Sequence, residues 1–186
     1  MKRSTGAIML FSLLFLAFTS EKTSSDGQDI YICLPCGADC DSMKHKGPGT
    51  CDHCNMALVK WSTIRHQNIA PGELCSFITK QGTGNVLLLD VRTVAEFEGK
   101  AEDKFGRLKN AVNIPIQELE ARMNELSNWK DKQVVVYCSH SHRSPKASYM
   151  LSQNGFRNVT NMLGGMSVWK TSVKDENCNQ QLFIRQ

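Results

Sequence analysis

The chain has 186 residues, of which 41% are hydrophobic and 22% charged, and its formal net charge at pH 7 is +4. This is the composition of a soluble globular protein, and the length suits one ordinary domain with a small additional module. The charge is too small, and the lysines and arginines are too scattered, to indicate a nucleic-acid partner, so we expect none.

The N-terminus has the pattern of an export signal. Lys2 and Arg3 precede an apolar run, Ala7–Phe18, and small residues follow it. The run is shorter than the roughly 20 residues that span a bilayer. We therefore expect a signal peptide over residues 1–20 and a polar linker over 21–29. The mature protein is then periplasmic or extracellular, with no stable membrane span after cleavage, and an uncleaved membrane anchor is the alternative.

The segment 30–60 holds five of the eight cysteines, including two C-x2-C pairs that are fourteen residues apart. Two such pairs supply four thiolates for the tetrahedral geometry that zinc prefers, and so short a segment needs a metal or disulfides to hold a shape. We expect a structural site for zinc or another soft divalent metal, with these ligands: Cys33, Cys36, Cys51 and Cys54. Cys40 is a fifth thiol that can substitute for one of them, and a pair of disulfides is the alternative to a metal.

The same segment resembles the small heavy-metal-binding modules of bacterial metal-efflux proteins. The likeness lies in Y-x-C at Tyr31–Cys33, in Pro-Gly at Pro48–Gly49 and in C-x-x-C-x-M-x-L-V at Cys51–Val59. Those modules usually have Met-His-Pro after the first cysteine, where this chain has LPCGADC. The resemblance therefore implies a metal but not which one.

From about Ile64 the pattern changes to alternating helices and strands. Apolar periodicity, N-terminal caps and glycine stops predict helices over 70–82, 93–100, 116–129, 144–155 and 166–173. Ser144 is the expected N-cap of the fourth helix, with Pro145 in its first position and Gly155 as its stop. Apolar runs predict strands over 85–92, 133–138 and 158–163, with a short strand or turn over 111–116. The alternation predicts an α/β fold, a parallel sheet flanked by helices.

One thiol, Cys138, stands at the end of a predicted buried strand and is followed by the polar residues Ser139–Arg143 and a helix. Ligands of parallel sheets sit at this end of the strands. The helix dipole and its free N–H groups favour a thiolate and a bound anion. Arg143 adds a fixed positive charge that can pair with an anionic substrate. The alternative is an unreactive core cysteine.

These residues carry a resemblance to the rhodanese family of sulfurtransferases. The matching stretches are LLLDVRTVAEFEGK at Leu87–Lys100, GRLKNAVNIP at Gly106–Pro115, VVVYCSHSHRSPKASYML at Val134–Leu151 and GFRNVTNMLGGMSVW at Gly155–Trp169. They imply a rhodanese-like domain over 64–172. They also imply that Cys138 carries sulfane sulfur as a persulfide from a small donor such as thiosulfate to a thiophilic acceptor, without a cofactor for that chemistry.

The resemblance also assigns the surrounding residues. The active-site loop is Ser139, His140, Ser141, His142, Arg143 and Ser144, and Asp90 and Arg92 brace it from the neighbouring strand end. The C-x4-R spacing from Cys138 to Arg143 has the sulfurtransferase length, whereas related phosphatases use a loop one residue longer.

The loop departs from the family at several positions. Ser139 stands where a basic residue is frequent, and Ser141 stands where glycine eases a sharp turn. His140 and His142 are unusual. Three roles are open for them. They replace the lost positive charge when protonated, they bind a soft metal together with Cys138, or they face solvent without a role in the site. The second of these possibilities gives an alternative function, a non-catalytic metal-binding or metal-sensing protein that uses the cysteine-rich segment and the loop with Cys138, His140 and His142. With either function, a metal-handling protein is a candidate partner.

Two remaining cysteines, Cys75 and Cys178, lie on the first helix and in the tail 173–186. The first and last helices of this kind of fold can lie side by side. We therefore expect these two cysteines to form a disulfide in the exported protein. The rest of the tail is expected to be loosely held.

Overall fold

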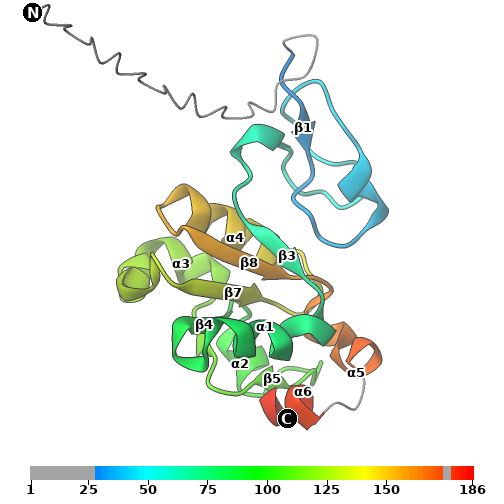
Figure 1. The fold of residues 1–186 in the computed structure, drawn as a ribbon. Coiled ribbons are helices and arrows are strands. Elements are labelled where there is room, and N and C mark those ends of the chain that lie inside the picture. Colours follow the sequence, from blue (N-terminus) through cyan, green and yellow to red (C-terminus); the bar gives the residue numbers. More distant parts are fainter. Residues whose placement is uncertain (1–27, 174–176) are drawn as a thin grey trace, which may run out of the picture.

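The computed structural model describes residues 28–173 and 177–186, so the predicted signal peptide lies outside the described residues. Figure 1 shows a small N-terminal lobe, which contains the cysteine-rich segment, above an α/β domain. In the described part of the chain, no helix has the length and apolar character needed to cross a membrane.

The centre of the α/β domain is a sheet of five parallel strands in the order β3-β8-β7-β4-β6. The strands are β3 (Gln67–Ile69), β4 (Val86–Asp90), β6 (Val112–Asn113), β7 (Gln133–Tyr137) and β8 (Asn158–Met162). The three strands expected from the sequence are present, and the stretch 111–116, expected as a short strand or turn, contains β6. Strand β3 was not expected, because three residues with two of them exposed give no apolar run to read.

Helices cover both faces of this sheet (Figure 1). They are α1 (Leu74–Gln81), α2 (Val94–Phe97), α3 (Ile116–Arg122), α4 (Arg143–Gln153), α5 (Trp169–Ser172) and α6 (Asn177–Leu182). Alternate side chains of β7 enter two separate cores: Val134 and Val136 pack with α3 and α4, whereas Val135 and Tyr137 pack with α1 and α5. This alternation is the period of two that a strand buried on both faces must have.

Two helix predictions need correction. Helix α4 begins at Arg143 with His142 in the N-cap position, so Ser144 and Pro145 lie in its first turn. The Ser144 hydroxyl therefore does not cap the helix and is available for another contact. The amphipathic stretch 116–129 divides into α3 and a 3-10 helix, Met123–Trp129. Gly155 follows α4 with a φ of 86°, the left-handed conformation expected of a helix stop.

The C-terminal tail is docked on the domain, which contradicts the expectation of a loose tail. Strand β9 (Phe183–Ile184) pairs antiparallel with β5 (Arg107–Leu108), and α6 precedes it. The ring of Phe183 stacks on Trp169 with centroids 6.1 Å apart. Burial of these apolar side chains against the α1 face supplies the favourable free energy that a polar tail would lack.

Cys75 on α1 and Cys178 on α6 form a disulfide, as predicted, with Cα atoms 5.9 Å apart. The Asn179 side chain supports the same contact. It accepts from Cys75 N–H at 3.2 Å and donates to the Gly72 carbonyl at 3.1 Å. A disulfide that closes so long a loop typically stabilises a domain by about 2–4 kcal/mol.

The cysteine-rich lobe has little regular structure. It contains an antiparallel pair, β1 (Tyr31–Ile32) with β2 (Val59–Lys60), and a 3-10 turn, Asp39–Ser42. The lobe touches the main domain where Asn161 of β8 donates to the Pro35 carbonyl at 3.3 Å. Because Asn161 stands next to the end of β8, the lobe lies at the carboxyl edge of the sheet.

Candidate functional site

Cys138 follows β7 directly and is fully buried, on the sheet face that α4 covers. Its sulfur donates to Ser144 Oγ across 3.4 Å. The backbone around it is fixed from the opposite side, because Cys138 and Ser139 carbonyls accept from Met166 and Ser167 N–H, each at 2.9 Å. Cys138 is thus enclosed between α4 on one side and the backbone of Met166 and Ser167 on the other.

Gly165 makes this close approach of the two segments possible. It has a φ of 64°, and a methyl group at its position would overlap the carbonyl oxygens of Cys138 and Ser139. Only glycine combines this conformation with the absence of a side chain. The Gly164-Gly165 pair thus sets the position of the loop's first residues.

The loop leaves buried N–H groups without acceptors. Ser139 and Ser141 are buried, yet in the described part of the chain their backbone N–H groups donate to no carbonyl or side-chain oxygen. The Ser141 hydroxyl also lacks a partner there. Buried donors are rarely left unpaired unless an ion, water or ligand completes them. Together with the N-terminus of α4, they make an environment that favours negative charge.

Ser141 has a φ of 60°. The loop thus makes the sharp left-handed turn for which glycine is the usual residue, and serine adopts it at a conformational cost. The sharp turn expected from the family resemblance is present, although serine stands where the family often has glycine.

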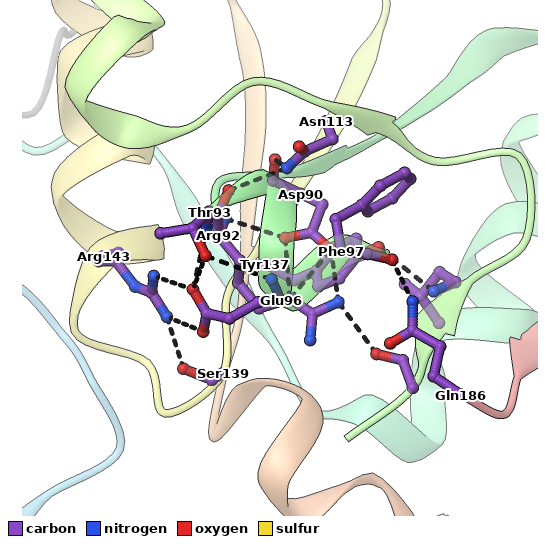
Figure 2. A network of polar contacts seen from close by, with 12 residues as sticks. Asp90, Arg92, Thr93, Glu96, Phe97, Asn113, Tyr137, Ser139, Arg143 and Gln186 are labelled. Atoms are coloured by element: carbon purple, nitrogen blue, oxygen red, sulfur yellow. Dashed lines mark hydrogen bonds and ion pairs between the residues drawn. The ribbon is translucent and has the colours of Figure 1, made fainter. Parts of the chain in front are cut away.

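Arg143 was expected to pair with an anionic substrate, but it already pairs with a carboxylate of the protein. Figure 2 shows its guanidinium paired with Glu96 of α2, through two contacts of 2.7 Å, and with Ser139 Oγ at 2.7 Å. Glu96 also closes a capping box with Thr93 at the start of α2. Arg143 lowers the pKa of Glu96 to about 2, so the carboxylate is ionised throughout the neutral pH range.

Asp90 and Arg92 form a fully buried ion pair at the end of β4. Arg92 Nη2 lies 2.7 Å from Asp90 Oδ2, and it also donates to the Gly106 carbonyl at 2.9 Å. Burial opposes the charge on Arg92, but the Asp90 carboxylate outweighs it and raises the pKa of Arg92. Asp90 is in register with Tyr137, the residue before Cys138. The pair thus supports the strand end that holds the thiol.

His140 and His142 are exposed on the outer side of the loop. The His140 ring meets the ring of Phe105 edge-on, with centroids 5.1 Å apart. Among the described residues, the thiol, imidazole and carboxylate groups close enough to share a metal lie in the cysteine-rich lobe, and Cys138 is not among them. The structure therefore does not bring Cys138, His140 and His142 together as a metal site.

In the lobe, the sulfurs that converge are those of Cys33, Cys40, Cys51 and Cys54, all within 4.8 Å of one another. Cys36, predicted as the fourth member of this set, lies instead beside Cys40 and Asp41, and Cys40, the predicted substitute, takes its place. The 3-10 turn that contains Cys40 folds back under the first knuckle, and spacing alone gave no sign of it.

Thiol chemistry differs within this group. Burial raises the pKa of Cys33, and it raises the pKa of Cys40 to about 12. The backbone N–H groups of Cys54 and His53 hydrogen-bond to the Cys51 sulfur and lower its pKa to about 7. The knuckle 51–54 thus supplies donors that stabilise a thiolate.

Sequence reasoning missed Glu96 as a site residue. Thr93 and Glu96 have the spacing of a capping box, which predicts the start of α2. The contact with Arg143 spans 47 residues, and no local pattern predicts such a pairing.

The family model described as a rhodanese-like domain matches residues 76–172. The chain belongs to the rhodanese-like domain family. The matched region runs from α1 through α5 and includes the Cys138 loop. The fold of this rhodanese-like domain, an α/β sheet with helices on both faces, is the one expected from the sequence.

Two curated relatives resemble the rhodanese-like domain. A protein named sulfurtransferase from Allochromatium vinosum is 37% identical over 87 residues, which cover 47% of this chain and 74% of that protein. The uncharacterized protein YqhL of Bacillus subtilis is 37% identical over 95 residues, which cover 51% and 69% of the two chains. Among solved structures, a rhodanese-related protein of Thermoplasma volcanium is 29% identical with a TM-score of 0.46, covering 59% of this chain and 96% of that one.

Proposed function

We propose that the protein is an exported sulfurtransferase that carries sulfane sulfur as a persulfide on Cys138. One observation carries the proposal: the unpaired N–H groups of the buried residues Ser139 and Ser141 lie in the Cys138 loop, just before the N-terminus of α4. Donors in this arrangement stabilise an anionic sulfur both before and after it is loaded. Membership of the rhodanese-like domain family and the Allochromatium vinosum relative support this chemistry.

The reaction has two half-reactions that meet at one sulfur atom. The Cys138 thiolate attacks the sulfane sulfur of thiosulfate, the sulfur–sulfur bond of thiosulfate breaks, and sulfite leaves with its electron pair. A thiophilic acceptor such as cyanide then attacks the outer sulfur of the persulfide and leaves as thiocyanate. Each step restores one negative sulfur to the N–H groups of the loop, so both states of the enzyme are stabilised by the same donors.

Intact-mass measurement of the full chain tests this proposal. Incubation with thiosulfate is expected to add one sulfur atom to the protein, and peptide mapping is expected to place it on Cys138. Subsequent cyanide is expected to remove it and yield one equivalent of thiocyanate. A chain that gains no sulfur from thiosulfate or from a low-molecular-weight persulfide would contradict the proposal.

The Glu96–Arg143 pair affects which donor is used. Nη1 and Nη2 of Arg143 each donate to one oxygen of the Glu96 carboxylate, so the loop entrance offers little net positive charge to a dianion. Glu96→Gln removes this neutralising charge with little change of shape. We expect it to lower the KM for thiosulfate about threefold to tenfold. The KM for a singly charged persulfide donor should fall less. Steady-state kinetics with both donors measures the difference.

Glu118→Gln is the matched control, because Glu118 also pairs with an arginine, Arg122, but on the exposed surface of α3. It is expected to leave both KM values unchanged. An unchanged or higher KM for thiosulfate in Glu96→Gln would show that Arg143 does not attract the donor.

Export is part of the proposal and rests on two features. The predicted signal over residues 1–20 is one of them. The Cys75–Cys178 disulfide is the other, because such bonds persist mainly in oxidising compartments. The partners we propose are a small-molecule sulfur donor, a thiophilic acceptor and a metal-handling protein that recognises the cysteine-rich lobe.

A further inference from the structure

Four buried or half-buried cysteines from three stretches of the lobe converge on one point. Their sulfurs lie within 4.8 Å of one another, and the sulfurs of Cys33 and Cys54 are 3.1 Å apart. Cys33, Cys40 and Cys51 are almost completely buried. These side chains form most of the lobe's small apolar cluster, together with Leu58. The lobe therefore has sulfur where a larger domain would have a hydrocarbon core.

The distances fit a shared cation. Four sulfurs bound to one zinc ion at about 2.3 Å stand roughly 3.8 Å apart at the corners of a tetrahedron. The 3.1 Å between Cys33 and Cys54 is longer than the roughly 2.05 Å of a disulfide bond. All five cysteines of the lobe are free thiols, whereas Cys75 and Cys178 are paired in the same structure. The arrangement thus matches a metal centre better than two disulfides.

Cys36 takes part in a different set of contacts. Its sulfur donates to Asp41 Oδ1 across 3.4 Å, and its own N–H and that of Gly37 donate to the same carboxylate at 2.7–3.0 Å. This carboxylate belongs to the 3-10 turn that contains Cys40, and it ties that turn to the backbone of Cys36 and Gly37. Cys36 thereby helps to position Cys40 rather than pointing its sulfur at the other three.

We propose that Cys33, Cys40, Cys51 and Cys54 bind one thiophilic divalent cation, with zinc as its representative, and that Cys36 is not a ligand. The centre joins the two knuckles and the 3-10 turn, so it replaces the core that the lobe cannot build from apolar side chains. It also fixes the segment 33–37, whose Pro35 carbonyl meets Asn161 at the carboxyl edge of the sheet. The proposal does not depend on sulfur transfer by Cys138.

The test compares two single substitutions that differ only in which neighbouring thiol is removed. The full chain, Cys36→Ser and Cys40→Ser are loaded with zinc, and bound metal is counted by elemental analysis. Affinity is measured by competition with a chromogenic chelator. The wild type and Cys36→Ser are expected to hold one zinc with similar affinity. Cys40→Ser is expected to bind zinc weaker by roughly 100-fold or more.

Cobalt gives a second readout that does not depend on the stability of the Cys40→Ser variant. The thiolate-to-cobalt absorption of the wild type and of Cys36→Ser is expected to be equal, because four thiolates bind the cobalt in each. Loss of metal in Cys36→Ser, or weaker thiolate absorption there, would overturn the ligand assignment. If the wild type held two zinc ions and Cys36→Ser held one, the proposal of a single centre would be wrong. A wild-type chain with no zinc and disulfides among these five cysteines would overturn the metal site itself.

Discussion

Cys138→Ser is expected to reduce sulfur transfer from thiosulfate to cyanide by roughly 1,000-fold or more. Serine is close to cysteine in shape and can keep the contact with Ser144, so the loop should persist. Its hydroxyl, however, is neither ionised near neutral pH nor able to hold a second sulfur as a stable anion. Thiocyanate formation measures the loss, and intact mass should show no added sulfur.

The same chemical change at Cys36 is the control for this experiment. Cys36 is also a buried thiol, but it lies in the lobe beside Asp41. Cys36→Ser should transfer sulfur at the wild-type rate. If Cys138→Ser kept a substantial part of the activity, or if Cys36→Ser lost it equally, the nucleophile would have to be sought in another cysteine.

Asp90→Ala is expected to lower the free energy of unfolding by about 3–5 kcal/mol. The substitution leaves the fully buried Arg92 guanidinium with the Gly106 carbonyl but without its carboxylate. Removing one partner of a buried ion pair has this large effect because the remaining charge has neither water nor counter-charge around it. Denaturant unfolding monitored by circular dichroism measures the change.

Asp131→Ala provides a matched comparison at the surface. Asp131 and Arg157 also form an ion pair of 2.8 Å, but their side chains are 71% and 77% exposed. Its loss should change the free energy of unfolding by no more than about 1 kcal/mol. The double variant Asp90→Leu/Arg92→Leu should be more stable than Asp90→Ala, because it leaves no charge buried. Equal effects of Asp90→Ala and Asp131→Ala would show that water reaches the Asp90 site.

The central part of the fold was predictable from sequence because it depends on local patterns. Strands β4 and β7 are runs of apolar residues buried on both faces, and such runs are visible in the sequence itself. Cys138 was found because a polar stretch follows one of these runs directly. The resemblance to the rhodanese family, rather than a local pattern, indicated the sharp turn at Ser141, which has a positive φ.

The parts that escaped prediction depend on contacts between distant residues. The pairing of Arg143 with Glu96 joins α4 to α2, and nothing near either residue indicates it. Cys40 was expected only as a substitute, because the C-x2-C spacing favours Cys36, and its position beside the other three cysteines depends on the fold of the turn Asp39–Ser42. The tail was expected to be loose apart from its predicted disulfide, but Phe183 stacks on Trp169 of α5 and β9 pairs with β5.

The bond between Cys75 and Cys178 closes a covalent ring that contains strands β4 to β8. If the two ends of the chain were pulled apart, tension would pass through the sulfur–sulfur bond and bypass everything between these two residues. Among the described residues, those outside the ring, which include the lobe, β3 and the residues after Cys178, would stretch. The segment that bears Cys138 would therefore keep its shape under a load that extends the rest of the molecule, until a reductant opens the ring.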